Sequence, residues 1–207
     1  DRMSCYGYKR KTTPFLEEWA SKSIVFDRVV ADGMWTVPTH ASMFTGKSVR
    51  QHGMEWGHLR LDDVHKTIAD QLSELGYRSL FLSNNIWLTR KTGLAKGFQT
   101  YHNLYQLNRI DLVSFELLLE QWGVTPFLPW MDRDFGANLT NHLANQWLDK
   151  HANNEEPLFV FVNYMEAHLP YSVPKKYRQM YMGDRQLDRS YDLLRTVYGV
   201  LIRAMEF

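Results

Sequence analysis

The sequence feature that most constrains the fold is a short apolar run near the end of the chain, Leu158–Tyr164. Its residues are mostly β-branched or aromatic, and a polar turn at Asn153–Glu156 precedes it. Successive side chains of a strand point to opposite faces, so an almost unbroken apolar run needs cover on both faces. We therefore predict a strand that is buried inside a parallel sheet.

Two further runs have the composition of strands, Ile24–Val30 and Arg78–Ser83. Helices are predicted around these strands, because apolar residues recur at helical spacing and threonine, proline or glycine marks several of the ends. The predicted helices start at Thr13-Pro14 or span Pro38–Phe44, Thr67–Leu75, Asn138–Lys150 and Ser190–Met205. Helices that alternate with buried strands indicate an α/β fold, a layered domain with a mostly parallel sheet flanked by helices.

The composition sets bounds on the class of protein and its partners. With 44% hydrophobic and 23% charged residues, the 207-residue chain is typical of a folded globular protein. The formal net charge of +1 gives no reason to expect a membrane-surface or nucleic-acid partner, so we expect no nucleic acid. The longest apolar stretches are too short to cross a bilayer, so no membrane span is expected in this chain.

Cysteine usage bears on the compartment. Cys5 is the single cysteine, so an intrachain disulfide is excluded, and the sequence has no Cys/His zinc pattern. A lone cysteine fits a reducing compartment. A cytoplasmic location is therefore slightly favoured, and the sequence leaves the compartment otherwise open.

Polar clusters follow each of the three predicted strands. Thr36–His40 follows the first, Asn84-Asn85 follows the second, and Glu166-Ala167-His168 follows the third. In an open α/β sheet, ligands bind beyond the carboxyl ends of the strands. The three clusters therefore predict one binding site at that edge of the sheet.

Thr36 is the sharpest candidate for chemistry. It precedes a predicted helix whose unpaired N–H groups and dipole favour an anion, and His40 lies one helical turn further on. A threonine hydroxyl becomes a nucleophile when a base or a metal removes its proton. A sulfate or phosphate ester, which presents an anionic tetrahedral centre, fits this arrangement. The alternative from spacing alone is that Thr36 or Thr39 only caps the helix.

The segment from Trp35 to Gly46 reads Trp-Thr-Val-Pro-Thr-His-Ala-Ser-Met-Phe-Thr-Gly. It resembles the nucleophile segment of the sulfatase family, in the alkaline phosphatase superfamily, where Cys or Ser is followed by x-Pro-x-Arg and then by Ala-Ser-x-x-Thr-Gly. Gln51-His52-Gly53 follows at the family's spacing, and residues 157–171 resemble the family's strand that ends in His-x-Pro-Tyr. The resemblance runs over nearly the whole chain and implies an alkaline-phosphatase-like layered domain.

The resemblance assigns roles to individual residues. Thr36 takes the position of the nucleophile, which is also a metal ligand, and His40 takes the position of the motif arginine. His168 matches a histidine that contacts substrate. Asn84 and Asn85 stand where the family has Gly-Lys-Trp-His, so we expect them to contact substrate in place of the cationic lysine.

The departures from the family pattern change the expected chemistry. Thr36 cannot become the formylglycine of sulfatases, and threonine occupies this position in relatives that act on phosphate esters, phosphonates or phosphoglycerol groups. A threonine ester must be resolved by attack on the central atom, so we expect phosphoryl esters to be preferred over sulfate esters. His40 adds a titratable group where the family has a fixed guanidinium.

The resemblance also predicts the domain organisation. Residues 1–207 are expected to be part of a sulfatase-like catalytic domain, with 103–133 as an insertion. The metal-binding acids of the family lie in an earlier strand and in a later Asp-His motif, which match no segment of this chain. The implied cofactor is a divalent metal, Ca, Mg, Mn or Zn, which these residues do not fully ligate. The chain by itself is therefore expected to be inactive.

The predicted function is metal-dependent hydrolysis, or transfer, of sulfate or phosphate esters through Thr36. The substrate is expected to be a small-molecule, glycan or lipid ester. The alternative is a non-catalytic sulfatase-like protein that binds anionic glycans or lipids in the same pocket, which the missing lysine favours. An unrelated nucleotide-binding module is not supported, because the chain has neither a Gly-x-Gly-x-x-Gly nor a Walker pattern.

Overall fold

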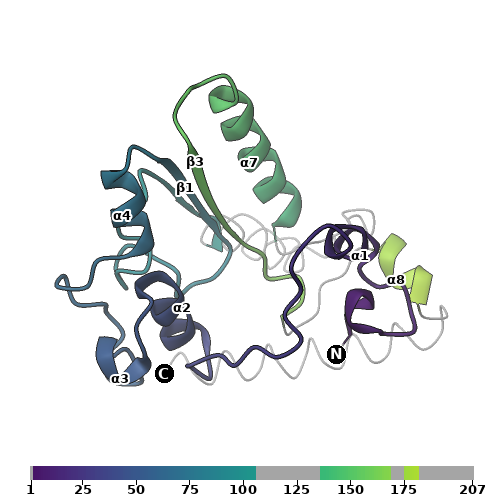
Figure 1. Cartoon of the computed structure of the whole chain (residues 1–207), viewed down its shortest axis with the longest axis horizontal. Coiled ribbons are helices and arrows are strands. Elements are labelled where there is room, and N and C mark those ends of the chain that lie inside the picture. Colours follow the sequence, from purple (N-terminus) through teal and green to yellow (C-terminus); the bar gives the residue numbers. More distant parts are fainter. Residues whose placement is uncertain (1, 106–135, 169–174, 182–207) are drawn as a thin grey trace, which may run out of the picture.

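The structure, a computed structural model, describes residues 2–105, 136–168 and 175–181 (Figure 1). Its centre is a three-stranded parallel sheet in the order β2-β1-β3, formed by Thr100–Asn103 (β2), Arg78–Ser83 (β1) and Leu158–Asn163 (β3). β1 pairs with β3 over its full length, from Arg78 opposite Leu158 to Ser83 opposite Asn163. The predicted α/β fold and two of its predicted strands are confirmed.

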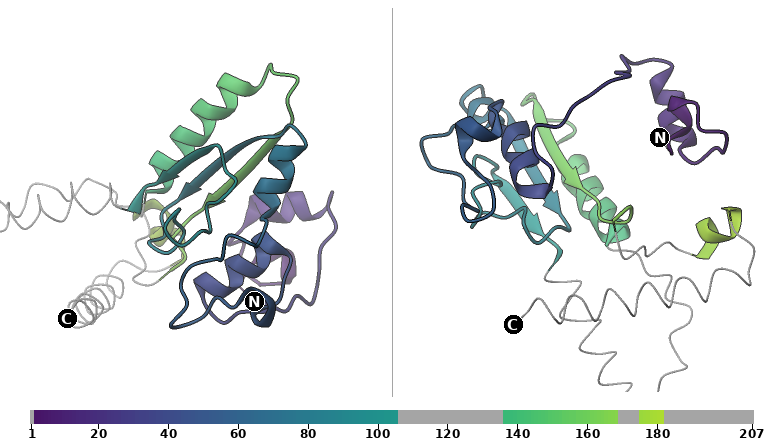
Figure 2. Two further views of the ribbon diagram at one scale, coloured as in Figure 1. Left: turned by 90° about the vertical axis from the view of Figure 1, so that its left-hand side faces the viewer. Right: turned by 90° about the horizontal axis from the view of Figure 1, so that it is seen from below.

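Helices cover both faces of the sheet (Figure 2). Thr36–Thr45 (α2) and Ile68–Glu74 (α4) lie on one side, and Ala137–His151 (α7) lies on the other. Alternate residues of the strands serve the two sides: Phe81 of β1 packs in the core under α2 and α4, whereas Leu80 and Leu82 pack with Trp147 of α7. The sheet is therefore the middle layer of three, as the apolar runs predict.

Helix ends are fixed by short-range hydrogen bonds. Thr67 begins α4 with a capping box, in which its hydroxyl accepts from the Asp70 N–H and the Asp70 carboxylate accepts from the Thr67 N–H. The Thr67 hydroxyl also donates to the Lys96 carbonyl, 3.1 Å away. Val49–His52 (α3) starts with a second capping box, built from Ser48 and Gln51. These contacts tie the loops to the layer beside the sheet.

A small group of elements lies to one side of the sheet (Figure 1). It contains a 3-10 turn at Ser4–Tyr6 (η1), Pro14–Ala20 (α1) and Lys175–Tyr181 (α8). Thr13 precedes α1, as predicted, and its hydroxyl accepts a hydrogen bond from the Ser4 N–H. Tyr181 donates to the Lys11 carbonyl, which connects α8 to the beginning of the chain.

Several predictions about elements need correction or lie outside the described residues. Residues 24–30 form no strand, and Ile24, Val29 and Val30 are 84%, 77% and 93% exposed. A β-branched run becomes a strand only when it pairs with a neighbour, and β1, β2 and β3 pair with one another instead. The predicted helix 190–205 and most of the predicted insertion 103–133 lie outside the described residues. Within the described part of the chain, no helix is long and apolar enough to cross a membrane.

Candidate functional site

Helix α2 points its first turn toward the carboxyl edge of the sheet. Phe44, near its end, contacts Phe98, which precedes β2, with ring centroids 6.0 Å apart. At the other end, Trp35 contacts Trp87, which follows β1, at 5.8 Å. Thr36 is the first residue of the helix, so it lies on the side of the sheet where the strands end.

The first turn of α2 has no side-chain cap. Trp35 is the N-cap residue, and neither Thr36 nor Thr39 caps the helix. The Thr39 hydroxyl instead donates to the Gly33 carbonyl at 2.9 Å. A Cβ on Gly33 would lie 2.7 Å from the Thr39 nitrogen, so only glycine lets the preceding loop pack this closely on the helix. The alternative that Thr36 or Thr39 is only a helix cap therefore finds no support in this geometry.

His40 lies one turn after Thr36 and is held in a defined orientation. Its Nδ1–H donates to the Thr36 carbonyl oxygen at 2.8 Å, which leaves Nε2 with its lone pair. The ring packs edge-on against Phe161 of β3, with centroids 6.0 Å apart. Burial lowers the pKa of His40 below its usual value, and the hydrogen bond to Thr36 only partly opposes this. Burial therefore favours the neutral form of the imidazole.

Asn84 and Asn85 follow β1 and are buried, at 3% and 7% exposure. The Asn84 amide donates to the Thr140 hydroxyl at 2.8 Å, which joins the sheet edge to α7. The Asn85 side chain accepts from the Trp87 N–H at 2.8 Å and lies 3.4 Å from the Met165 sulfur. These bonds organise the strand ends, and contact of either residue with substrate remains a prediction.

The cluster after β3 contains one residue whose role the sequence did not indicate, Glu166. Its Oε1 accepts from the Ala137 N–H at 2.8 Å and so caps α7. Its Oε2 is buried, with no hydrogen-bond partner among the described residues. His168, the predicted substrate contact, is exposed and donates its backbone N–H to Met165 at 2.8 Å. Two contacts link residues that adjoin the clusters: Asn85 lies against Met165, which precedes Glu166, and Trp35, which precedes Thr36, contacts Trp87.

His52 is nearly fully buried, yet its hydrogen bonds exclude it as the base of a serine nucleophile. The Met54 N–H donates to its Nδ1 at 3.1 Å, so the ring proton is on Nε2 and is donated to the Ser42 oxygen at 2.9 Å. The Ser42 hydroxyl points to the Asp32 carboxylate, 3.4 Å away. His52 therefore cannot take the Ser42 proton, and the three groups tie the loop before α2 to α2 and α3.

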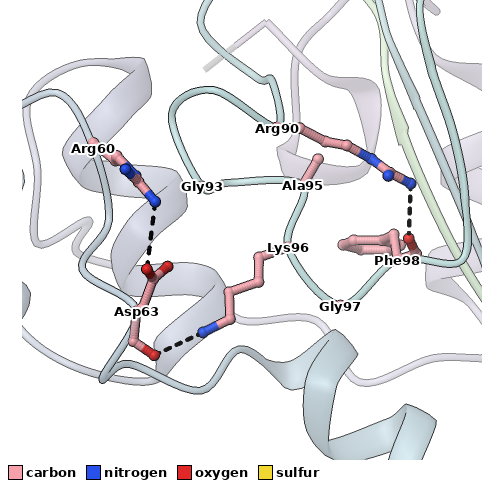
Figure 3. Close-up of a pocket in the computed structure, with 8 residues that line it drawn as sticks. All are labelled: Arg60, Asp63, Arg90, Gly93, Ala95, Lys96, Gly97 and Phe98. Carbon is pink, nitrogen blue, oxygen red and sulfur yellow. Dashed lines mark hydrogen bonds and ion pairs between the residues drawn. The ribbon is translucent and has the colours of Figure 1, made fainter.

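A cavity of about 240 Å³, whose lining does not include Thr36, lies between two loops (Figure 3). Its three cationic side chains are already engaged. Arg60 pairs with Asp63 at 3.4 Å, Lys96 donates to the carbonyls of Asp63 and His65, and Arg90 donates to Phe98. An anion would have to displace these contacts, so the cavity is a weaker candidate for ester binding than the first turn of α2.

The family resemblance implies a divalent metal, and the donor atoms test that expectation. Among residues 2–105, 136–168 and 175–181, no three His, Cys, Asp or Glu side chains come together. Hard divalent cations need several oxygen or nitrogen ligands. The described residues therefore do not fit a complete metal site.

A family model described as "Sulfatase" matches residues 1–201 of the 207. The chain belongs to the sulfatase family. The match includes the segment with Thr36 and His40 and all three strands of the sheet.

This sulfatase-family chain is similar to two curated sulfatases. It is 20% identical to human iduronate 2-sulfatase over 209 residues, which cover 86% of this chain and 35% of the relative. It is 25% identical to the ulvan-active sulfatase of Formosa agariphila over 185 residues, which cover 82% of this chain and 33% of the relative. The chain thus spans about a third of the length of these relatives.

A solved structure supports the fold of the sulfatase-family chain. The phosphonate monoester hydrolase of Agrobacterium radiobacter superposes with a TM-score of 0.62 at 20% identity. The superposition covers 88% of this chain and 41% of that structure. The likeness confirms the alkaline-phosphatase-like α/β fold that the sequence predicts.

Proposed function

We propose that the full-length protein hydrolyses sulfate or phosphate esters with Thr36 as the nucleophile. One observation carries the proposal: Thr36 begins a helix that has no side-chain cap and that starts at the carboxyl edge of a parallel sheet. The Thr36 and Val37 N–H groups precede the helical hydrogen-bonding pattern, and Pro38 contributes no N–H. An ester anion placed there meets backbone donors and the positive end of the helix dipole.

The proposed reaction has two steps, and it uses the Thr36 hydroxyl, His40 and the N–H groups of the first turn. The Thr36 hydroxyl oxygen forms a bond to the sulfur or phosphorus atom, and the bond to the ester oxygen breaks and leaves its electron pair on the alcohol. The hydroxyl proton passes to the neutral Nε2 of His40, directly or through water, and then to the leaving alcohol. Water attacks the same central atom in the second step, the bond from that atom to the Thr36 oxygen breaks, and a proton of the water passes to the Thr36 oxygen. The N–H groups of the first turn offset the charge on the non-bridging oxygens in both steps.

We infer a preference for phosphoryl over sulfate esters. A threonine ester lacks the aldehyde-forming route by which a formylglycine hydrate expels sulfate, so its central atom must be attacked by water. The solved neighbour is named as a phosphonate monoester hydrolase, whereas both curated relatives are named as sulfatases. A threonine nucleophile favours the first of these chemistries for the present chain.

A non-catalytic role is the second candidate function. Its supporting observation is Asn84, which stands in the segment where the family has a cationic lysine and which is buried against Thr140. A protein of this kind would bind anionic glycans or lipids at the same edge of the sheet. It would bind an ester without converting it.

The test is an assay of the full-length protein with matched aryl sulfate, phosphate monoester and phosphate diester substrates. We expect Thr36→Ala to lower kcat/KM by at least about 1,000-fold, because loss of a covalent nucleophile removes several kcal/mol of transition-state stabilisation. Thr36→Ser keeps the hydroxyl and should retain measurable turnover. The matched control is Thr12→Ala, which removes a threonine hydroxyl just before α1 that donates to the Arg2 carbonyl. This change should leave turnover unchanged.

Three outcomes would change the proposed function. Unchanged turnover in Thr36→Ala removes Thr36 as the nucleophile, and sulfate turnover faster than phosphate turnover overturns the phosphoryl preference. Binding without any turnover by the native protein favours the non-catalytic role.

We also propose that activity requires a divalent cation with Thr36 among its ligands, so a chelator should abolish turnover and one of Ca, Mg, Mn or Zn should restore it.

A further inference from the structure

Three tryptophans gather beside Thr36, although they are far apart in the sequence. Trp35 precedes α2, Trp56 comes from the loop after α3, and Trp87 follows β1. The rings of Trp35 and Trp56 stack with centroids 4.6 Å apart and an interplanar angle of 14°. Trp87 meets both edge-on, at 5.8 Å from Trp35 and 6.4 Å from Trp56. We call Trp35, Trp56 and Trp87 the tryptophan cluster.

The tryptophan cluster is open to solvent on one side. Trp35 and Trp87 are partly buried against the core beneath α2. Trp56 is 71% exposed even though Trp35 stacks on it. The sequence neighbours Met34 and Ile86 are also exposed, at 101% and 47%. A contiguous exposed patch of large apolar side chains often marks a binding surface, whereas a single exposed apolar side chain does not.

The ring geometry limits what the surface can bind. A cationic group such as a quaternary ammonium is held in a cage of rings around an empty centre. The stacked rings of Trp35 and Trp56 leave no such centre between them, and the edge of Trp87 covers the adjoining side. What remains available is the exposed surface of the Trp56 indole, which is flat and uncharged. A flat, uncharged ring packs best on such a surface, by the same contacts that aromatic pairs make.

We propose that the tryptophan cluster binds the organic group of the ester, and that this group is an uncharged ring with an apolar face. The inference rests on the proposed function, because it places the anionic centre at Thr36 and the ring against the neighbouring tryptophans. Thr36 follows Trp35 directly, and Trp35 stacks on Trp56, so the tryptophan cluster adjoins the proposed nucleophile. An aryl ring and the apolar face of a sugar ring share this chemistry, and the experiment separates them.

The experiment measures the binding of esters to the full-length protein by calorimetry and by quenching of tryptophan fluorescence. The probes are phenyl, hexopyranosyl and methyl esters, each as the phosphate and as the sulfate. We expect Trp56→Ala to weaken binding of a ring-bearing ester about 3- to 10-fold, the worth of one aromatic contact, and to leave the methyl esters unchanged. Trp56→Phe should keep most of the affinity, because it keeps an aromatic face.

Matched controls make the result specific to this site. Trp19→Ala removes a tryptophan that is 61% exposed on α1, outside the cluster, and should change no affinity. A loss confined to phenyl esters identifies an aryl substrate, and a loss confined to hexopyranosyl esters identifies a sugar ester. Equal weakening of the methyl esters, unchanged affinity for both rings, or no binding of either ring overturns the proposal. Binding can be measured without turnover, so the two proposals can be tested separately. If Trp56→Ala weakens binding of ring-bearing esters in an inactive Thr36→Ala protein, the ring site is supported whether or not Thr36 is the nucleophile.

Discussion

Two apolar segments of similar composition differ in structure: one is a paired strand, and the other forms no strand. Leu158–Asn163 is β3, paired along its length with β1 and packed by Phe159 and Phe161 against the core. Residues 24–30 are just as rich in β-branched and aromatic residues, yet they form no strand and expose Val30 at 93%. The difference shows that composition marks a segment as able to form a strand, whereas pairing with a neighbour makes it one.

The largest expected difference between the two segments is in stability. Phe161 contacts the rings of Phe44 and Phe81, with centroids 5.0 and 4.9 Å away. We expect Phe161→Ala to lower the free energy of unfolding by about 3 kcal/mol, because it leaves a cavity in this aromatic core. The matched change Phe26→Ala, at a side chain 65% exposed, should cost less than about 0.5 kcal/mol. Denaturant unfolding measures both, and equal losses would abolish the contrast.

A smaller effect concerns the pH dependence of stability through His40. Its pKa is lowered in the folded protein by burial, to which Phe161 contributes, so the unfolded chain binds the proton more tightly. The stabilising contribution of neutral His40 is complete above about pH 6.5, the unfolded value. It is lost as the pH falls from there toward the lower folded pKa, and it changes no further below that value.

Substitutions in the two segments test whether β3 causes the lowered pKa of His40. Phe161→Leu opens the surroundings of His40, so its pKa, measured by NMR titration, should rise toward the usual value and the acid-side loss of stability should shrink. His40→Gln should remove this part of the loss, and the remainder is expected from His52, whose pKa burial also lowers. Val30→Ser should leave the His40 pKa unchanged. A His40 pKa that does not move in Phe161→Leu would contradict the assignment of its cause to β3.

The smallest expected effect is on the exposed segment itself. Val29→Ser and Val30→Ser remove apolar side chains that are 77% and 93% exposed. Each should change the free energy of unfolding of the full-length protein by less than about 0.5 kcal/mol, as surface substitutions generally do. A loss of about 2 kcal/mol or more, measured by denaturant unfolding, would mean that this segment is buried in the full-length protein, and would remove the contrast with β3.

The strands differ in how far local sequence predicts them. The sequence predicts Arg78–Ser83 and Leu158–Tyr164 as buried strands, and the second strand ends one residue earlier than predicted, at Asn163. β2 was not predicted, because Thr100–Asn103 mixes polar and aromatic residues and becomes a strand through its pairing with Leu80–Ser83. The error at 24–30 has the same origin, since the partner of a strand is not encoded within the strand.

The candidate site likewise contains features that local sequence predicts and features that depend on tertiary contacts. Thr36 and His40 share a helix turn, which spacing alone predicts, and the structure connects them through the Thr36 carbonyl. Trp56 reaches Trp35 across 21 positions of chain, a contact that no local pattern indicates. The hydrogen bonds of Asn84 and the capping of α7 by Glu166 are likewise tertiary. The sequence motif therefore locates the proposed nucleophile, and the surroundings of that residue depend on the fold.

The register of β1 also bears on the order in which the protein assembles. Leu80 pairs with Thr100, a short way along the chain, whereas Arg78 pairs with Leu158, about four times further. Closing the longer loop costs about 1.2 kcal/mol more in chain entropy, and it must wait until β3 has left the ribosome. During synthesis α2, α4, β1 and β2 can gather first, with His40 still facing water. The ring of Phe161 arrives last, so we expect the surroundings of His40 to be the final part of this layer to form.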